Sequence, residues 1–217
     1  MSYGFPKILP KNGCAKSYIK DITVLTRRDK NDAKSGFCGL LQGLRAIDFD
    51  EVKDDLCEDV FVEPTKSVDC FFAAKKGLYY FIEFKNSTKE SLDGLGKVRI
   101  TDPKTHKLTW VPAIEYSLRK KAFDSISIAA KTVLQGVPAK TIMDNAVYIV
   151  VRRNRDVGSV LEFLNDLTSV SGGIVGSAKG SSPVLWNLDK LKVLGFFKEV
   201  YTWTENEFVA QARQLLA

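Results

Sequence analysis

Three residues near the middle of the chain, Asp69, Glu83 and Lys85, have the types and the spacing of a hydrolytic site that uses a metal ion. Thirteen residues, mostly aromatic or aliphatic, separate Asp69 from Glu83, and Lys85 follows two positions later. Because side chains alternate along a strand, Glu83 and Lys85 lie on one face. Two carboxylates at a cross-strand spacing of about 5 Å repel each other unless a cation lies between them. A divalent cation such as Mg²⁺ suits the pair, and the chemistry indicated is hydrolysis of a phosphodiester.

The turn between the two strands decides whether Asp69 shares that face. The apolar runs Ser67–Ala74 and Leu78–Asn86 predict a β-hairpin whose loop ends in Gly77. A two-residue loop would put Asp69 on the far side, whereas a three-residue loop puts it directly opposite Glu83. Three-residue loops favour a left-handed residue at their last position, where Gly77 stands. The sequence therefore predicts the register that brings the two carboxylates together.

The segments around the hairpin predict a mixed α/β protein, with a mixed central sheet flanked by helices. Apolar periodicity indicates helices in the stretch before the hairpin and an amphipathic helix after it, and a buried strand follows that helix. A small hairpin is expected within the polar connection, and the three tryptophans are expected to be packing residues. The expected elements are a strand within Tyr18–Thr26, helices at Phe37–Ile47 and Phe49–Asp59, the small hairpin at Lys97–Trp110, the helix Ala113–Gln135, the strand Ala146–Arg153, the helix Ser159–Ser169, the strand Phe196–Trp203 and the helix Asn206–Leu216.

Composition argues against several other classes of protein. The chain has 217 residues, of which 45% are hydrophobic and 27% charged, which predicts one folded domain over 1–217. Four cysteines without a Cys-x-x-Cys pair, together with a single histidine, argue against a structural zinc site and a His-based triad. No apolar run reaches the length of a signal peptide or a membrane span, so a cytoplasmic protein is expected. A net charge of +6 is compatible with nucleic acid as a partner.

The arrangement of Asp69, Glu83-Phe84-Lys85, the following helix and the next strand resembles the PD-(D/E)XK nuclease superfamily. The resemblance covers roughly residues 45–155, and the segment 156–217 is then an extension packed on that core. Val68 stands where the family usually has proline, and the connection from the hairpin to the next helix is longer than usual. The resemblance implies an αβββαβ core, as in restriction endonucleases.

The resemblance also implies residue roles and a substrate. Asp69, Glu83 and the Phe84 carbonyl would bind Mg²⁺ or Mn²⁺, and Lys85 would position the attacking water. The expected substrate is DNA, and cutting of both strands would favour a homodimer. The following helix would lie beside the phosphates, where its basic residues Arg119, Lys120 and Lys121 would bind the nucleic acid.

Several alternatives stay open at the level of sequence. The fold could carry a non-catalytic module that binds nucleic acid or assists assembly, and Glu83 and Lys85 would then form an ordinary salt bridge. Family members often add one acid from a helix before the first strand. The stretch Asp48–Glu63 holds eight acidic residues, and most of them are expected to be solvated surface. The candidates for the additional acid are Glu51, Asp54, Asp55 and Glu58.

Overall fold

The computed structural model describes residues 18–27, 41–57, 65–74, 77–87, 89–101, 105–153 and 184–215. In these residues a six-stranded sheet has the order β1-β2-β3-β4-β7-β8, and a separate two-stranded sheet pairs β5 with β6. β1 to β4 pair antiparallel, whereas β4, β7 and β8 are parallel. The predicted mixed α/β class is confirmed. The six strands are β1 (Ile19–Asp21), β2 (Arg45–Asp48), β3 (Cys70–Ala73), β4 (Tyr79–Lys85), β7 (Ala146–Arg152) and β8 (Glu199–Thr204).

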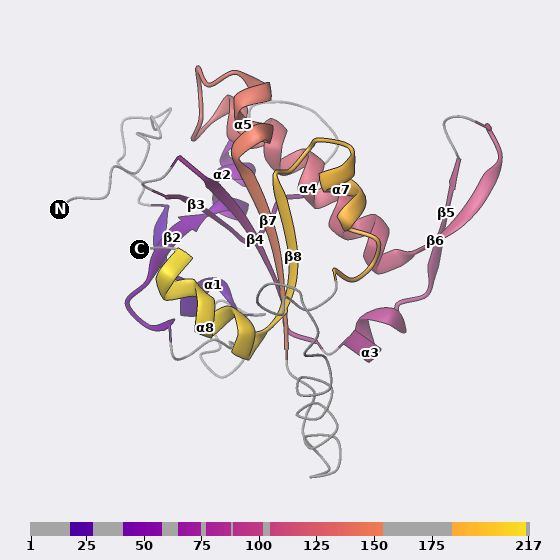
Figure 1. The fold of residues 1–217 in the computed structure, drawn as a ribbon, viewed down its shortest axis with the longest axis horizontal. Helices are drawn as coiled ribbons and strands as arrows, with labels where there is room; N and C mark the ends of the chain where they lie inside the picture. The colour runs from indigo at the N-terminus through magenta and orange to yellow at the C-terminus, as the bar shows by residue number, and fades with distance from the viewer. Residues whose placement is uncertain are drawn as a thin grey trace, which may run out of the picture.

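Helices cover both faces of this sheet (Figure 1). Phe81 belongs to the apolar core that packs under α2, α4, α5 and α7, while its neighbour Ile82 belongs to the core under α1 and α8. A strand covered on both sides is apolar at successive positions, which is why the run before Glu83 shows no alternation. The helices are α1 (Ile22–Leu25), α2 (Phe49–Cys57), α3 (Lys89–Asp93), α4 (Ala113–Lys131), α5 (Ala139–Asn145), α7 (Asp189–Val193) and α8 (Glu205–Leu215).

The hairpin register agrees with the three-residue loop. β3 pairs with β4 so that Cys70 lies opposite Ile82, and one residue further Asp69 comes opposite Glu83. At the other end the Ala74 N–H donates to the Leu78 carbonyl over 2.9 Å. Gly77 has a φ of +75°, as the last loop position requires. The pattern of the turn alone was thus enough to predict which face of the sheet Asp69 occupies.

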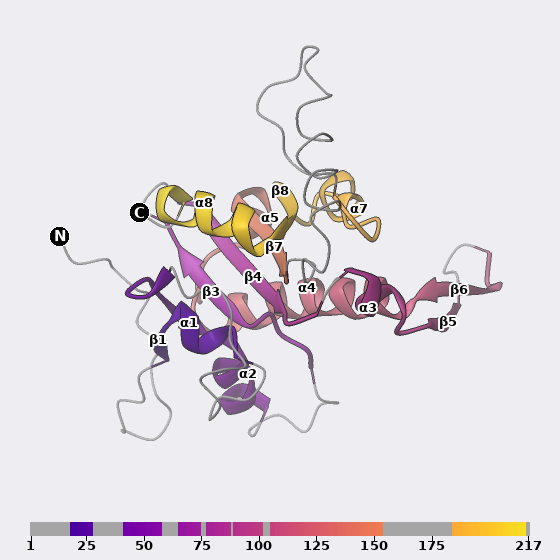
Figure 2. The same cartoon turned by 90° about the horizontal axis from the view of Figure 1, so that it is seen from below.

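The described elements contain the order expected from the resemblance, with further elements inserted, of which α3 lies between β4 and β5 and α5 lies between α4 and β7. The sequence α1, β2, β3, β4, α4, β7 follows an αβββαβ pattern, α2 lies between β2 and β3, and the β5–β6 hairpin lies between β4 and α4. β5 (Lys97–Thr101) and β6 (Leu108–Pro112) form an arm that stands away from the main body (Figures 1 and 2). A small hairpin was predicted here, and its projection from the body was not.

Two expectations were wrong. The helix expected over Phe37–Ile47 is a turn at 41–44 followed by strand β2, in the part that the structure describes. Ala46 and Ile47 are buried in the two cores on opposite faces of the sheet, and such a short two-sided apolar run has no period that separates strand from helix. Trp110, expected to be a core or packing residue, is 64% exposed on the arm, whereas Trp203 is buried as expected.

The other expected elements agree with the structure to within a few residues, or lie outside the described part, whereas α3, α5 and α7 were not predicted. The strand within Tyr18–Thr26 shortens to β1, because α1 follows it directly. The helix expected at Ser159–Ser169 lies among residues that the structure does not describe. In the described part, no helix is long and apolar enough to cross a membrane.

Candidate active site

Asp69 is held just before β3 by contacts with three other elements. Its backbone carbonyl accepts a hydrogen bond from the Phe49 N–H at the start of α2, at 3.1 Å. The preceding Val68 N–H donates to the Ser125 hydroxyl of α4, at 2.9 Å. The Asp69 carboxylate itself accepts from the Phe84 N–H of β4, at 2.5 Å. These contacts fix the position of the carboxylate beside the end of β4.

Glu83 lies in the centre of the sheet and is fully buried. A buried carboxylate is strongly unfavourable unless cations and hydrogen bonds compensate its charge. Two lysines do so here: Lys85 Nζ lies 2.6 Å from Glu83 Oε1, and Lys121 Nζ lies 2.8 Å from each Glu83 oxygen. Lys121 Nζ also lies 3.7 Å from Asp69 Oδ1. One ammonium group therefore lies within ion-pair distance of both carboxyl groups.

Lys121 reaches the carboxylates because of its position on α4. It lies one turn beyond Leu118 and one turn before Ser125, both fully buried against the sheet. Of the three basic residues, Lys121 lies nearest the apolar stripe of the helix in the sequence, and this was the available signal that it turns toward the sheet. Its proximity to Glu83 could not be read from the sequence, since that depends on how α4 packs across β4.

The electrostatics of the site couple these groups. Burial, and then the neighbouring Glu83 carboxylate, raise the pKa of Asp69 to about 8, against a lowering effect of Lys121 and Lys85. Burial alone would lower the pKa of Lys121, but the Glu83 and Asp69 carboxylates raise it by more, so the net shift is upward. Near neutral pH the Asp69 carboxyl therefore carries a proton that a cation could displace.

A pocket of about 470 Å³ opens over these residues at the carboxyl end of β4. Its charged lining groups are four carboxyls and three cationic side chains, so its charge is close to balanced. The lining residues are Leu25, Thr26, Arg27, Asp48, Asp50, Asp69, Glu83, Phe84, Lys85, Asn86, Ser87 and Lys121. Glu83 is enclosed, whereas the side chains of Asp69, Lys85 and Lys121 are each about one-fifth exposed, so a ligand in the pocket can reach them.

The acids that join the pocket from the stretch 48–63 are Asp48 and Asp50, which sequence reasoning did not select. Asp48 caps α2, since its carboxylate accepts from the Glu51 N–H at 3.2 Å, and it also pairs with Lys20 at 2.9 Å. Asp50 accepts a hydrogen bond from the Ser67 hydroxyl, at 2.5 Å. The spacing Asp48-x-Asp50 at a helix start was the signal that could have found them.

Three of the four acids that the sequence did single out lie in the described residues, and none of these three lines the pocket. Glu51 pairs with Lys20 at 2.7 Å. Asp54 pairs with Lys53 at 3.0 Å and is largely exposed. Asp55 accepts a hydrogen bond from the Tyr18 hydroxyl. Glu58 lies outside the described residues.

The three basic residues expected to bind nucleic acid point in different directions. Lys121 enters the pocket. Arg119 instead pairs with Glu115 at 2.8 Å and donates to the Asn187 carbonyl at 3.0 Å. Lys120 is half-buried and does not line the pocket. Residues in succession on a helix differ by about 100° in direction, so this tripeptide cannot present all three cations to one ligand.

Asn86 is a further polar group of the pocket that the sequence did not indicate. Its amide Nδ2 donates to the Thr26 carbonyl at 2.7 Å, which links the end of β4 to the end of α1. Its Oδ1 is buried without a hydrogen-bond partner. A buried acceptor without a partner is costly, so this atom would favour a donor such as a water molecule in the pocket.

The donors of the pocket suit a cation held by two carboxylates. The Lys121 ammonium, placed between Glu83 and Asp69, shows that the pair attracts positive charge. Within the described residues there is no group of three or more acidic, histidine or cysteine side chains placed to hold a metal. The set fits Mg²⁺, which binds through one or two carboxylates and keeps several waters, better than a metal that needs a closed protein cage.

Comparison with protein-family models, curated proteins and solved structures gave no match to this chain.

Proposed function

We propose that the chain is a Mg²⁺-dependent nuclease that hydrolyses phosphodiester bonds, with DNA as the expected substrate. The observation that carries the proposal is the meeting of Asp69, Glu83 and Lys85 on one face of a central hairpin, in an open pocket at the end of β4. Two carboxylates and an adjacent lysine at this place form the smallest set that such chemistry requires. The +6 net charge of the chain is consistent with a polyanionic substrate.

In this proposal each residue has a distinct role. Asp69, Glu83 and the Phe84 carbonyl would hold the ion. Bound Mg²⁺ would supply a Lewis acid that stabilises the charge developing on the scissile phosphate. Lys85, 20% exposed at the pocket, orients the attacking water with its amino group.

Lys121 has a role that the resemblance does not supply. Its ammonium and a metal ion would compete for the same oxygens of Glu83, so the lysine must move when the ion binds. A long, partly exposed side chain can rotate toward the pocket opening, where it would contact a phosphate oxygen. Lys121 would thus stabilise the metal-free site and bind substrate in the metal-loaded one.

The occupation of the site by Lys121 also favours a second candidate, a nucleic-acid-binding module without catalysis. In that case the ion pairs of Lys121 with Glu83 and Asp69 are permanent, and the carboxylates serve the fold rather than a metal. The two candidates differ in whether a divalent ion displaces the ammonium.

A cleavage assay separates the candidates. Metal-free protein is incubated with supercoiled plasmid, a single-stranded DNA and an RNA of the same sequence, with Mg²⁺, Mn²⁺ or EDTA. Wild type should cleave only when Mg²⁺ or Mn²⁺ is present. Lys85→Ala should reduce the rate of cleavage by roughly 10²–10⁴-fold, the range for loss of a positioned proton-transfer or water-orienting group. Lys140→Ala is the matched control, since Lys140 is 81% exposed on α5 and pairs with Asp144. Equal cleavage by wild type and Lys85→Ala would contradict the proposal, and no cleavage of any substrate would favour the binding module.

A further inference from the structure

The β5–β6 arm exposes large apolar side chains that the body of the molecule does not cover. Leu108 is 54% exposed and Trp110 is 64% exposed. The arm projects from the start of α4 in both views (Figures 1 and 2), and at its base the Ala113 N–H donates to the Gly96 carbonyl at 2.9 Å. A two-stranded hairpin by itself is marginally stable in water, so a ligand that covers it would stabilise it.

One face of the arm combines an aromatic ring with cations. The register places Arg99 opposite Trp110 and Lys97 opposite Pro112, and alternation puts all four on the same side. Arg99 Cζ lies 5.9 Å from the centroid of the Trp110 ring. The indole and the guanidinium thus form adjacent contact groups on an exposed surface.

The charge of the arm has one sign in its described residues. Residues 97–101 and 105–112 include Lys97, Arg99 and Lys107, and they include no aspartate or glutamate. Cations interleaved with an exposed aromatic ring are complementary to a strand of nucleic acid, because phosphates meet the cations and a base can stack on the ring. A protein partner of the usual kind would bury more apolar surface and fewer like charges.

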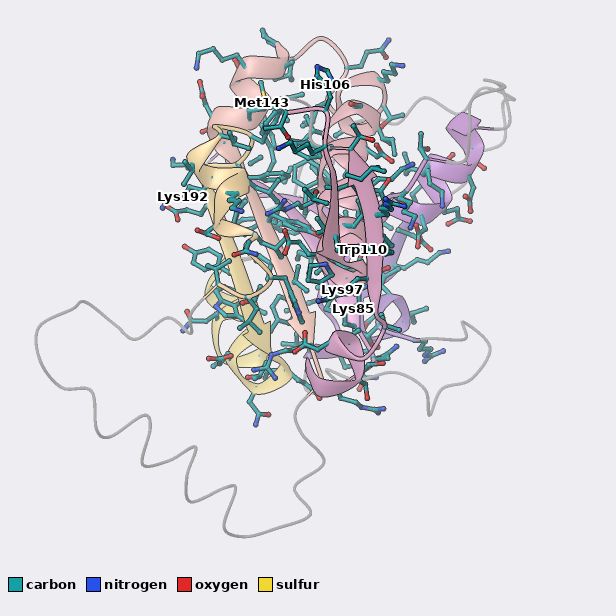
Figure 3. The ribbon with its side chains drawn as sticks, turned by 90° about the vertical axis from the view of Figure 1, so that its right-hand side faces the viewer. Lys85, Lys97, His106, Trp110, Met143 and Lys192 are labelled. Atoms are coloured by element: carbon teal, nitrogen blue, oxygen red, sulfur yellow. The ribbon has the colours of Figure 1, made fainter. Side chains whose placement is uncertain are left out.

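The base of the arm lies close to the pocket along the chain. Ser87 lines the pocket, α3 follows at Lys89–Asp93, and the arm begins at Lys97. In the view from the side of the arm, Lys97 and Lys85 lie at a similar height and His106 of the arm lies above them (Figure 3). The arm is therefore joined to the body by the chain segment that directly follows the pocket.

We propose that the arm binds single-stranded nucleic acid, with Trp110 stacking on a base and Lys97, Arg99 and Lys107 contacting phosphates. The inference rests on the proposed function, since the bound strand is the substrate of the pocket. A single strand is favoured over a duplex because an exposed indole needs the face of an unpaired base.

The test measures binding without cleavage. A fluorescein-labelled 20-nucleotide single strand and the duplex of the same sequence are titrated in EDTA, and the fluorescence anisotropy is followed. Trp110→Ser should weaken binding of the single strand by roughly tenfold and change duplex binding much less, and Trp110→Phe should restore most of the loss because phenylalanine also stacks. Val193→Ser, which removes an 80% exposed apolar residue from α7, is the control for the loss of surface apolar area.

A second variant tests the cations. The affinity for the single strand falls as salt rises, with a slope of log affinity against log salt of about −0.7 per phosphate contact. Changing Lys97, Arg99 and Lys107 to glutamine should make this slope less steep by about 2. The matched triple variant changes Lys131, Lys140 and Lys198 to glutamine, three exposed lysines that lie outside the arm. Equal losses in both triple variants would overturn the proposal, since the effect would then reflect net charge alone.

Other outcomes would overturn this inference about the arm and leave the proposed nuclease function unaffected. If the arm variants bind like wild type while wild type cleaves DNA with Mg²⁺, the arm is not the binding surface. Equal loss on single strand and duplex in Trp110→Ser would contradict stacking on a base. If sedimentation shows a dimer that Trp110→Ser dissociates, with strand binding unchanged, the arm binds a second copy of the chain instead. Conversely, loss of strand binding in the arm variants of a protein that never cleaves would support the arm and refute the nuclease.

Discussion

Replacing Asp69 by asparagine should stabilise the metal-free protein, and more so at high pH. Asparagine keeps the size of the side chain and an oxygen that can accept from the Phe84 N–H. It removes the carboxyl whose pKa is raised to about 8 by burial and by the Glu83 carboxylate. In the unfolded chain this carboxyl titrates near its ordinary value of 3.8. The folded state therefore holds a proton that the unfolded state has lost, over the pH range between these two values.

The sign of the effect follows from this difference. Because the folded state binds more protons, wild-type stability falls as the pH rises from about 4 to about 8, and the loss is complete above that. Between pH 5 and pH 8 the folded state binds one more proton than the unfolded state, and each pH unit then lowers the free energy of unfolding by about 1.4 kcal/mol. Over three pH units this amounts to about 4 kcal/mol. The Asp69 side chain is 20% exposed to the pocket, so water and movement of Lys121 offset about half of this. The advantage of Asp69→Asn in the free energy of unfolding should be about 2 kcal/mol larger at pH 9 than at pH 5.

Urea denaturation in EDTA at pH 5, 7 and 9 measures this difference. Asp144→Asn is the control, since Asp144 is 54% exposed and pairs with Lys140 outside the pocket. That variant should differ from wild type by the same amount at pH 5 and pH 9. If the free energy of unfolding of Asp69→Asn also differs from that of wild type by the same amount at both pH values, then the pKa of the Asp69 carboxyl is not raised in the folded state and the reasoning is refuted.

Three further predictions concern the same site and its hairpin. Binding of Mn²⁺, followed by calorimetry, should strengthen up to tenfold per pH unit below about pH 8 with release of a proton, because the ion displaces the proton of Asp69, and pH-independent binding between pH 6 and 8 would contradict this. Lys121→Met should raise Mn²⁺ affinity by about tenfold or more, since the ammonium competes for Glu83, and an unchanged affinity would show that the two do not compete. Gly77→Ala should cost about 1–2 kcal/mol in urea denaturation, because a β-carbon disfavours a φ of +75°, and no loss would remove the turn as the cause of the register.

The part of the site that could be predicted from sequence is the part fixed by local rules. Alternation along a strand placed Glu83 and Lys85 on one face, and the turn ending in Gly77 set Asp69 opposite Glu83. The strand alternation and the turn extend over about twenty residues of chain, so no tertiary information was needed. The αβ class followed from the same patterns.

The part that could not be predicted depends on packing between distant segments. Lys121 reaches Glu83 across 38 positions of sequence because α4 crosses the face of β4. Asp50 joins the pocket through Ser67, which is 17 positions away. The apolar run at β2 was misread as helical, because a strand covered on both faces lacks the period of an amphipathic one. Trp110 was expected to be a core or packing residue, since the sequence does not show that this hairpin leaves the body.

The position of a divalent ion tests the central claim most directly. Crystals of the metal-free protein soaked in Mn²⁺ are measured at the manganese absorption edge, and the anomalous difference map locates the ion. The proposed metal site predicts a peak between the Asp69 and Glu83 carboxylates, with Lys121 Nζ moved away from the 2.8 Å contacts it makes with Glu83. An empty map at this position, with Lys121 still bound to both carboxylates, would contradict it.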